Sequence, residues 1–277
     1  MKKACVIGYP IAHSRSPIIH NYWLKHYEMD GRYEKREVKP EQLSGFLSNL
    51  KAEGYVGCNV TIPHKEAAIA SVAHIDEIVR KTGSLNTVYF EDGALWATST
   101  DGEGFYQNMQ AAFPDIELAG KKVIVLGAGG AARAIIERLI RAGAEVQILN
   151  RTPARAQELA SLFGSQAKAI DTDRFVTESR NTALLINTTS QGMKGDAGPA
   201  VQLSALPKTA VVADIVYVPL KTDFLKQAEV QGLRTVGGLG MLLHQAVVGF
   251  EKWFGVRPEV TPELYQLVAN DVARDSH

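Results

Sequence analysis

The sequence predicts an α/β protein, and three observations lead to that prediction. Short apolar runs alternate with helix-like segments along the 277 residues, as they do where helices cover a mainly parallel sheet. One such run, residues 123–126, leads directly into a glycine-rich turn and then into a segment with apolar residues at helical spacing. With 45% hydrophobic and 22% charged residues, the chain has room for one large or two medium domains.

The first part of the chain alternates predicted strands and helices. The predicted elements are strands at residues 4–8, 33–38 and 55–60, helices starting at 17, 41 and 103, and a hairpin within residues 81–99. Pro17 suits the first turn of a helix, where its missing N–H costs nothing, and Ser16 is the predicted N-cap. Asp92 and Gly93 form the predicted hairpin turn. The first domain is placed at residues 1–101.

The glycine turn has the form of a dinucleotide-binding loop. It fits G-x-G-x-x-G/A with alanine in the third slot, and it lies between a strand-like run and a helix-like segment. Gly127 permits the tight turn, Gly129 lets the backbone approach a pyrophosphate, and the helix start offers free N–H groups. A second apolar run at residues 146–149 completes a strand–helix–strand unit. The alternative is a turn that only packs the helix against the sheet.

The residues after that second run bear on the choice between NAD and NADP. An NAD site places an acidic side chain about 20 residues after the glycines, where it holds the ribose 2′-hydroxyl. This chain has Asn150, Arg151 and Thr152 there, followed by Arg155, and no carboxylate. Because a guanidinium matches a 2′-phosphate bidentately, NADP is the predicted cofactor. The alternative is that the two arginines form the solvated face of the next helix.

The strand–helix pattern continues to the end of the chain. Further strands are predicted at residues 184–187, 211–217 and 233–236, and apolar helices at 241–254 and from 261 on. Polar residues 188–193 follow one of these strands, at the kind of strand end where ligands bind. Gln245 lies among apolar neighbours, so its amide needs hydrogen-bond partners. A doubly wound dinucleotide domain is placed at residues 102–237 and C-terminal helices at 238–277.

Charge and cysteine content argue against several classes of protein. Thirty basic and thirty acidic residues cancel, so no overall field attracts the chain to nucleic acid or anionic lipid. No uncharged apolar run reaches the roughly 18 residues of a membrane span, and no signal-peptide cleavage site is evident. Cys5 and Cys58 show no metal-ligand spacing, as expected of reduced thiols in a cytoplasmic protein without a bound metal.

Two serines and an aspartate are candidate site residues in the first domain. Ser14 and Ser16 lie where a strand end meets a helix start, so their hydroxyls either cap the helix or bind a small anion. Asp101 lies just past the hairpin and either caps the following helix or takes part in a site.

A second polar cluster follows the third predicted strand. Asn59 and Thr61 leave that strand together, and Pro63 is predicted to open a helix that begins at His64. Lys65 would then lie at the positive end of the helix, an unfavourable position that hints at function. The alternatives are a surface lysine and a capping or surface histidine.

A set of short motifs is spread over nearly the whole chain. The motifs are Gly8-x-Pro10-Ile-x-His-Ser14-x-Ser16-Pro17, Asn59-Val-Thr-Ile-Pro-His-Lys65, Gly83-x-x-Asn86-Thr87, Thr100-Asp101-x-x-Gly104, Gly127-Ala-Gly-Gly-Ala131, Asn150-Arg-Thr152, Ser190-x-Gly-Met193, Tyr217-x-Pro219 and Gly240-Met-Leu-Leu-x-Gln245. In this combination the chain resembles the shikimate dehydrogenases of aromatic amino-acid biosynthesis.

The resemblance implies an N-terminal substrate domain, a Rossmann-type NADP domain, a C-terminal helix returning to the first domain, and an active site in the cleft between the domains. It implies reversible reduction of 3-dehydroshikimate to shikimate, with Lys65 and Asp101 as the catalytic pair and Lys65 as proton donor and acceptor. The other implied substrate-binding residues are Ser14, Ser16, Asn59, Thr61, Asn86, Tyr217 and Gln245. The implied cofactor-binding residues are Glu77, Gly127, Ala128, Gly129, Gly130, Ala131, Asn150, Arg151, Thr152, Arg155, Thr188, Thr189, Ser190, Met193, Ile215 and Gly238.

Two positions depart from the family pattern. Ser84 stands where the family usually has alanine, and Ser99 where asparagine often precedes the Thr-Asp pair. Both are small and polar, so they leave the chemistry intact but could tune substrate choice. The alternative activities are oxidation of quinate or of an amino-substituted shikimate, with NAD as a further cofactor option, and a catalytically silent NADP-sensing module. The sequence leaves the oligomeric state open, with a homodimer as one candidate.

Overall fold

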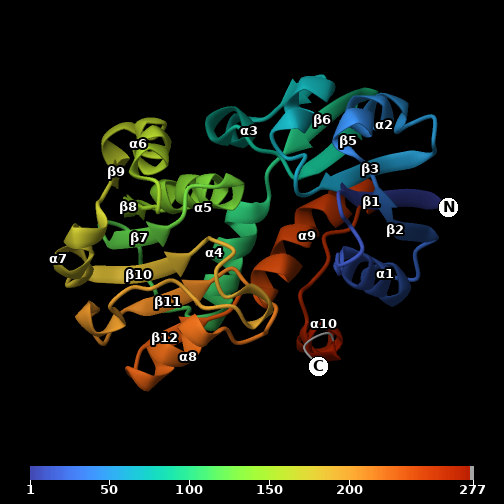
Figure 1. Ribbon diagram of the computed structural model, residues 1–277. Helices are drawn as coiled ribbons and strands as arrows, with labels where there is room; N and C mark the ends of the chain where they lie inside the picture. Colours follow the sequence, from blue (N-terminus) through green and yellow to red (C-terminus); the bar gives the residue numbers. More distant parts are fainter. Residues whose placement is uncertain (275–277) are drawn as a thin grey trace. The chain divides into compact units, whose positions relative to one another are not determined.

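The computed structural model describes residues 1–274, which divide into two compact units. The first unit contains Met1–Asp101 and Gln245–Val268, and the second contains Gly102–His244 and the stretch from Ala269 on. Each unit has a six-stranded sheet with helices packed against it (Figure 1). The predicted α/β class is therefore confirmed.

The sheet of the first unit combines parallel and antiparallel strands. Its strands are β1 (Lys2–Gly8), β2 (Gly31–Glu37), β3 (Tyr55–Val60), β4 (His74–Ile75), β5 (Thr87–Glu91) and β6 (Ala94–Thr98). Their spatial order is β2-β1-β3-β5-β6-β4, with β1 parallel to β2 and β3, and β5 antiparallel to β3 and β6. The β5–β6 pair is the predicted hairpin, and Asp92 and Gly93 at its turn both have positive φ.

Helices cover both faces of this sheet. They are α1 (Ser16–His26), α2 (Leu43–Asn49), α3 (Glu77–Thr82), the 3-10 helices Pro40–Gln42 and Ala67–Ser71, and those parts of α9 (Leu239–Phe254) and α10 (Pro262–Arg274) that belong to the first unit. One core joins Cys5 and Ile7 of β1 to Leu47 of α2. A second, aromatic core includes Trp23 of α1 and Phe250 of α9, whose ring centroids are 5.4 Å apart. Figure 1 shows α1 and α2 on opposite sides of the sheet.

The second unit has an all-parallel sheet. Its strands are β7 (Lys122–Leu126), β8 (Glu145–Leu149), β9 (Ala167–Ala169), β10 (Thr182–Asn187), β11 (Val211–Asp214) and β12 (Arg234–Val236). The spatial order β12-β11-β10-β7-β8-β9 is that of a doubly wound dinucleotide-binding fold, in which the chain direction around the sheet reverses beside β7. The predicted Rossmann-type architecture of this part of the chain is therefore confirmed.

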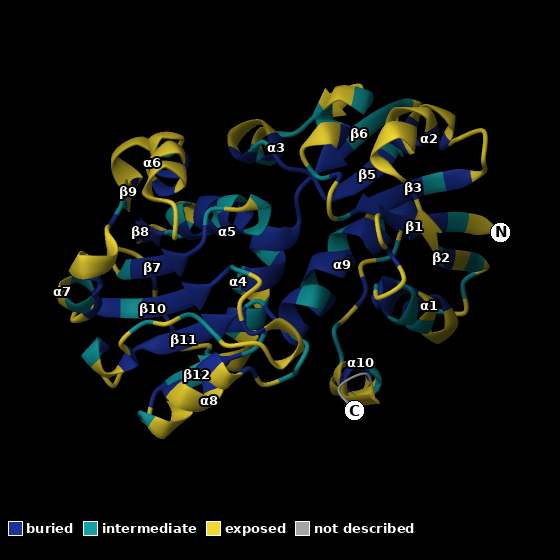
Figure 2. Ribbon diagram, in the orientation of Figure 1, coloured by how far each residue is buried: buried dark blue, intermediate teal, exposed yellow. Residues whose placement is uncertain are grey.

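Alternating side chains of β7 explain why both faces of the second sheet are covered. Val123 and Val125 pack with Ile135 in one core, whereas Ile124 and Leu126 belong to another. The helices around this sheet are α4 (Asp101–Ala112), α5 (Gly130–Arg141), α6 (Pro153–Ser161), α7 (Phe175–Ser179) and α8 (Asp223–Val230), with 3-10 helices at Gly164–Gln166, Thr172–Arg174, Met193–Gly195 and Leu203–Ala205. Figure 2 shows the inner strands β8, β7, β10 and β11 largely buried and the outer faces of the helices exposed.

The helix predicted after Pro63 is wrong. Residues 61–66 form turns and irregular structure, and only the 3-10 helix Ala67–Ser71 follows them. The carbonyl of Lys65 accepts a hydrogen bond from the amide of Leu85 at 3.0 Å. This carbonyl is therefore bonded to a neighbouring segment instead of to the next turn of a helix. His64 is buried rather than at the surface, and its Nε2 donates to the carbonyl of Val38 at 2.7 Å.

The capping role predicted for Ser16 is also wrong. Helix α1 begins at Ser16 itself, and Arg15 occupies the N-cap position without a side-chain capping bond. The Ser16 amide instead donates to Oγ of Ser14 at 3.4 Å. Ser14, rather than Ser16, therefore accepts the hydrogen bond at the start of this helix.

The two cysteines are distant in the sequence but adjacent in the first sheet. The parallel register pairs Cys5 of β1 with Cys58 of β3, and both are buried free thiols. Burial, followed by the neighbouring Cys58, raises the pKa of Cys5 well above its usual value. A thiol that stays protonated is a poor nucleophile, so the pair serves packing.

Candidate active site

Three strand ends meet at one edge of the first sheet. The registers pair Asn59 of β3 with Thr87 of β5, and Thr87 with Thr98 of β6. Because β5 runs antiparallel to both neighbours, its beginning lies beside their ends. The segments that leave these positions carry the predicted residues Lys65, Asn86 and Asp101.

Lys65 and Asp101 form an ion pair within the first unit. Nζ of Lys65 donates a hydrogen bond to Oδ2 of Asp101. The side chains are 21% and 9% exposed, so water screens this pair less than a surface pair. Asn86 donates from Nδ2 to Oδ1 of the same carboxylate at 2.9 Å. Other side chains thus bind both oxygens of Asp101, and the alternative of a simple helix cap does not describe this residue.

Asn86 is the centre of this cluster. Its Oδ1 accepts from the Thr100 amide at 2.9 Å, and its Nδ2 lies 2.9 Å from Oγ1 of Thr100 and 3.3 Å from Oε1 of Gln245. The amide oxygen of Gln245 on α9 therefore has hydrogen-bond partners in this cluster. The structure brings together Lys65, Asn86, Asp101 and Gln245, all predicted site residues.

Asn59 is bonded almost entirely within the protein. It is 5% exposed, and its Nδ2 donates to the carbonyl of Asn86 at 3.1 Å and to Oγ1 of Thr87 at 3.2 Å. Its Oδ1 accepts from the hydroxyl of Tyr33 at 2.6 Å. Because both amide hydrogens are used, Asn59 has no donor left for a ligand.

Ser14 and Ser16 lie together at the start of α1. Oγ of Ser14 donates to Oγ of Ser16 at 3.3 Å, and the amide of Ser16 returns a bond to Oγ of Ser14. Ser16 is 6% exposed and Ser14 half-buried. Thr61, also half-buried, follows the end of β3. Hydroxyl groups at a helix N-terminus suit a small anion such as a carboxylate.

The glycine turn of the second unit leaves space for a phosphate group. Gly127 has φ +112°, and a Cβ there would lie 2.6 Å from Oγ1 of Thr188, so a side chain would be both strained and crowded. Gly129 is the N-cap of α5 and has no side chain to occupy the free N–H groups of the first turn. A pyrophosphate therefore fits this helix end.

The residues after β8 are open to solvent. Nδ2 of Asn150 donates to the carbonyl of Thr152 at 3.0 Å, which fixes the turn before α6. Arg151 and Arg155 are exposed, and no carboxylate within residues 1–274 pairs with either. Both guanidinium groups thus remain available to an anion.

Two further loops follow β10 and β11 at the carboxyl edge of the second sheet. Oγ1 of Thr188 donates to the carbonyl of Leu126 at 2.7 Å, which holds that loop beside the glycine turn. A Cβ on Gly238 would lie 2.1 Å from the carbonyl oxygen of Ile215, so only glycine fits there. The loops carry the predicted residues Thr188, Thr189, Ser190, Met193, Ile215 and Tyr217.

Glu77 differs from the other predicted cofactor residues because it lies exposed on α3 of the first unit.

Several residues that build these sites were not predicted from the sequence. Tyr33 and Thr100 organise the cluster of the first unit, and Asn187 and Asp214 organise the loops of the second. The last two are polar residues at the ends of apolar strands, which is a signal that could have identified them. Tyr33 carries no comparable signal, since tyrosine is common in strands.

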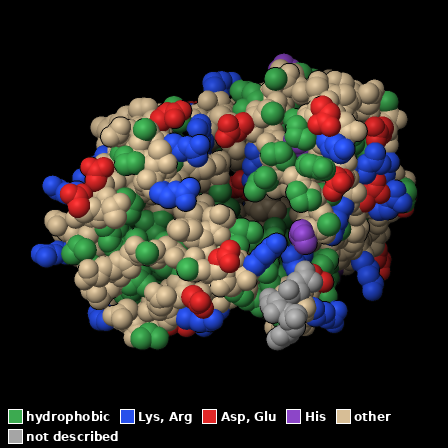
Figure 3. All heavy atoms as spheres, viewed as in Figure 1, with side chains coloured by type: hydrophobic (Ala, Val, Ile, Leu, Met, Phe, Trp, Pro, Cys, Tyr) green, Lys and Arg blue, Asp and Glu red, His purple; other side chains and the backbone are tan. Residues whose placement is uncertain are grey.

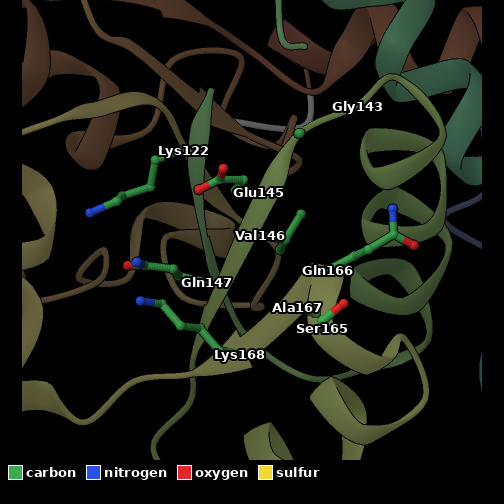
Figure 4. A pocket seen from close by; sticks show the side chains of 10 residues that line it. Lys122, Gly143, Glu145, Val146, Gln147, Ser165, Gln166, Ala167 and Lys168 are labelled. Atoms are coloured by element: carbon green, nitrogen blue, oxygen red, sulfur yellow. The ribbon is translucent and has the colours of Figure 1, made fainter. Parts of the chain in front are cut away.

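A surface hollow lies at the opposite, amino end of the second sheet (Figure 4). Lys122, Glu145, Gln147 and Lys168 line it. Nζ of Lys122 is 2.8 Å and Nζ of Lys168 3.9 Å from Oε2 of Glu178, and hydrogen bonds from Lys122 and Gln147 lower the pKa of Glu178 to about 2. Since these lysines are already paired and ligands bind at the carboxyl end of such sheets, the hollow is not the candidate site.

Neither a metal-binding cluster nor a membrane-spanning helix is found in the described part of the chain. Within residues 1–274, no group of three or more His, Cys, Asp or Glu side chains is placed to hold a metal ion. No helix in the same range is long and apolar enough to cross a membrane. On the face that Figure 3 shows, acidic and basic side chains are interspersed, in agreement with the formal net charge of zero.

Comparison with known proteins adds independent information. Residues 6–88 match the shikimate dehydrogenase substrate binding domain, residues 108–218 the shikimate / quinate 5-dehydrogenase family, and residues 238–262 the shikimate 5′-dehydrogenase C-terminal domain. A Brucella abortus protein named shikimate dehydrogenase (NADP(+)) is 49% identical over 277 residues, which cover 99% of this chain and 96% of that protein.

The fold of this chain is also similar to those of solved dehydrogenase structures. Shikimate 5-dehydrogenase from Thermus thermophilus, in complex with NADP(H) and shikimate, is 35% identical with a TM-score of 0.87, over 100% of both chains. Quinate dehydrogenase from Corynebacterium glutamicum, in complex with NAD, is 26% identical with a TM-score of 0.88, over 97% of this chain and 99% of that one.

Proposed function

This chain belongs to the shikimate dehydrogenase family, and we propose that it catalyses the reversible, NADP-dependent reduction of 3-dehydroshikimate to shikimate. The observation that carries the proposal is the Lys65–Asp101 pair, held by Asn86 at the edge of the first sheet. An ammonium group fixed in this way suits proton transfer to an oxygen that gains negative charge.

Lys65 would act as the proton donor in the direction of shikimate formation. NADPH, when bound, supplies the hydride that reduces the ketone carbon. The Lys65 ammonium would give its proton to the ketone oxygen, and the neutral amine would take the proton back from the alcohol in the reverse reaction. Asp101 would orient the amine, because its Oδ2 is the hydrogen-bond acceptor for Nζ.

The neighbouring polar residues suit a small hydroxylated carboxylic acid. Ser14 and Ser16 would hold the carboxylate, whereas Thr61 and Gln245 would contact ring hydroxyls. Asn59 would act indirectly, since its amide hydrogens hold the backbone of Asn86 and the side chain of Thr87. Shikimate offers the required groups: one carboxylate and three ring hydroxyls.

The second unit would hold the cofactor. The glycine turn and the N-terminus of α5 would bind the pyrophosphate, and Arg151 and Arg155 the 2′-phosphate. We assign residues 1–101 to substrate binding and catalysis, 102–237 to NADP binding and 238–277, which include α9 and α10, to a C-terminal part that returns to the substrate domain. A cytoplasmic location is part of the proposal, as are the choice of NADP over NAD and a homodimer as the assembly to test.

Steady-state kinetics test this function against its rivals. We expect kcat/KM for shikimate with NADP to exceed the values for quinate with NADP and for either substrate with NAD. A higher value for quinate with NAD would support the quinate dehydrogenase alternative, to which the Corynebacterium structure lends weight. Turnover of neither substrate would contradict catalysis and support the NADP-sensing alternative.

A further inference from the structure

A buried carboxylate that the reaction does not use lies at the end of β11. Asp214 is 1% exposed and accepts three hydrogen bonds. The donors are Nδ2 of Asn187 at 2.9 Å, the amide of Val216 at 3.0 Å and Oγ1 of Thr222 at 2.7 Å. All three donors lie next to the carboxyl edge of the sheet. The side chain of Asp214 therefore links the end of β10, the segment after β11 and the start of α8.

Through Asn187, the carboxylate holds the loop at residues 188–193. Asn187 lies opposite Asp214 in the β10–β11 register. Its Nδ2 also donates to the carbonyl of Gln191 at 3.0 Å, and its Oδ1 accepts from the amide and the hydroxyl of Thr189 at 3.0 and 2.7 Å. Asp214 thus fixes the orientation of the amide that shapes this loop.

The loop at residues 215–222 is held from both of its ends. At one end the Val216 amide bonds to Oδ1 of Asp214, and at the other the Thr222 hydroxyl bonds to Oδ2. Thr222 is also the N-cap of α8, where its side chain accepts from the amide of Leu225. The start of α8 and this loop are therefore tied to the same carboxylate.

The two loops also contact each other. The amide of Lys194, the residue directly after the first loop, donates to the carbonyl of Val218 in the second loop at 2.8 Å. A Cβ on Gly192 would lie 3.5 Å from Thr222 and 3.9 Å from Oδ2 of Asp214, so the first loop packs directly over this group. Loss of the carboxylate would therefore loosen both loops together.

The charge on Asp214 is balanced by hydrogen bonds rather than by a cation. Burial raises its pKa to about 6, and the bonds from Thr222, Val216 and Asn187 act in the opposite direction. No lysine or arginine within the described chain forms an ion pair with it. A buried charge without a cation lowers stability, so stability does not account for a carboxylate at this position.

We propose that Asp214 is a positioning residue that holds the 188–193 and 215–222 loops in the conformation that binds NADP. The proposal rests on the proposed function, because these loops carry the predicted cofactor residues Thr188 to Ser190, Met193 and Ile215. Asp214 itself is buried beneath them and contacts neither substrate nor cofactor in this assignment.

The test compares Asp214→Asn with the wild-type protein. The amide keeps the shape of the side chain but can no longer accept from all three donors. We expect the Kd and KM for NADP to rise roughly tenfold or more, whereas kcat at saturation falls less than about threefold. The midpoint of unfolding at pH 8 should not fall, because the substitution removes a buried charge.

The control is Asp223→Asn, which removes an exposed carboxylate one residue from Thr222. Asp223 bonds to Lys226 at 2.9 Å on the surface of α8, and its loss should leave the Kd for NADP unchanged. An unchanged Kd in Asp214→Asn would overturn the proposal, as would a higher Kd that only reflects a loss of folded protein.

Hydrogen exchange without NADP separates this inference from the proposed function. In Asp214→Asn, we expect faster exchange at residues 188–193 and 215–222 and unchanged exchange in β7 and α5. Equal exchange in variant and wild type would overturn the positioning role even if the enzyme uses NADP. If the wild type does not bind NADP, the proposed function fails and the inference fails with it, whereas local loosening without a change in affinity overturns the inference alone.

Discussion

The ammonium of Lys65 donates a hydrogen bond to the carboxylate of Asp101, 36 positions later in the chain. The relationship arises because β5 lies between β3 and β6 and is antiparallel to both, which brings two strand ends and one strand start to the same edge. The pair is thus a product of the hairpin, and Asn86 at the same edge donates a hydrogen bond to the other oxygen of the Asp101 carboxylate.

Lys65→Met tests the proton-transfer role. The variant keeps a similar length but has no proton to donate, so we expect kcat to fall by about 10²- to 10⁴-fold while KM for shikimate changes little. Steady-state kinetics measure both constants. Lys25→Met is the matched control, because this lysine is exposed at the end of α1, and it should behave as wild type. Near-normal turnover in Lys65→Met would remove Lys65 from the mechanism.

A double-mutant cycle tests whether Asp101 acts through Lys65. Asp101→Asn removes the charge that orients the amine, and we expect a large loss of kcat on its own. If the two residues act as a unit, the double variant with Lys65→Met should lose little more than the worse single variant. Losses in kcat/KM that multiply would mean that Asp101 contributes independently of Lys65.

Arg151→Ala tests recognition of the 2′-phosphate. The side chain of Arg151 is exposed after β8. A hydrogen bond from its guanidinium group to a phosphate would contribute about 1.5–3 kcal/mol to binding. KM for NADP should therefore rise roughly 10- to 150-fold, and KM for NAD should stay the same, because NAD lacks the phosphate. Arg155→Ala, measured in parallel, compares the second arginine. An equal change for both cofactors would place Arg151 elsewhere in the site.

The buried His20 predicts acid sensitivity of the first unit. It is fully buried and stacks on Tyr33 at 4.0 Å, and burial lowers its pKa to about 3. The unfolded chain binds this proton at higher pH than the folded one does, so stability is complete above about pH 6.5 and is lost as the pH falls towards 3. The loss between pH 6.5 and 4.5 should be roughly 2 kcal/mol.

Urea unfolding of His20→Phe at several pH values measures this effect. The variant fills the same aromatic site without a titrating group, so its free energy of unfolding should fall less steeply below pH 6.5. His26→Gln changes an exposed histidine of the same helix and should keep the wild-type slope. Identical slopes for all three proteins would exclude His20 as the source.

Ser84→Ala tests the cost of an unusual buried hydroxyl. Ser84 is 1% exposed, and among the described residues its Oγ has no hydrogen-bond partner. Since an unsatisfied buried hydroxyl is unfavourable, alanine should raise the free energy of unfolding by about 1 kcal/mol. Ser99→Ala makes the same comparison at the other atypical position, whose Oγ is also unpartnered. A fall in stability would show that these hydroxyls have partners, such as bound water.

Elements that are marked by a strong pattern in a few consecutive residues could be predicted from the sequence. The continuous apolar run of β7 and the Asp-Gly turn were recognisable because each depends on a few consecutive residues. Elements without such a pattern were missed: the two-residue β4, the three-residue β9 and helices α3, α7 and α8. Short edge strands depend on their neighbours in the sheet more than on their own sequence.

The sequence by itself determined the α/β class, the glycine turn after β7 and the strand ends at which polar residues gather. Only the tertiary structure decided how those residues are used. In the folded protein, both amide hydrogens of Asn59 are used in internal hydrogen bonds and Lys65 lies in a turn. Asp214 is buried beneath two loops. The physical reason is that burial and hydrogen-bond partners depend on strand register, and the register joins residues that are distant in the sequence.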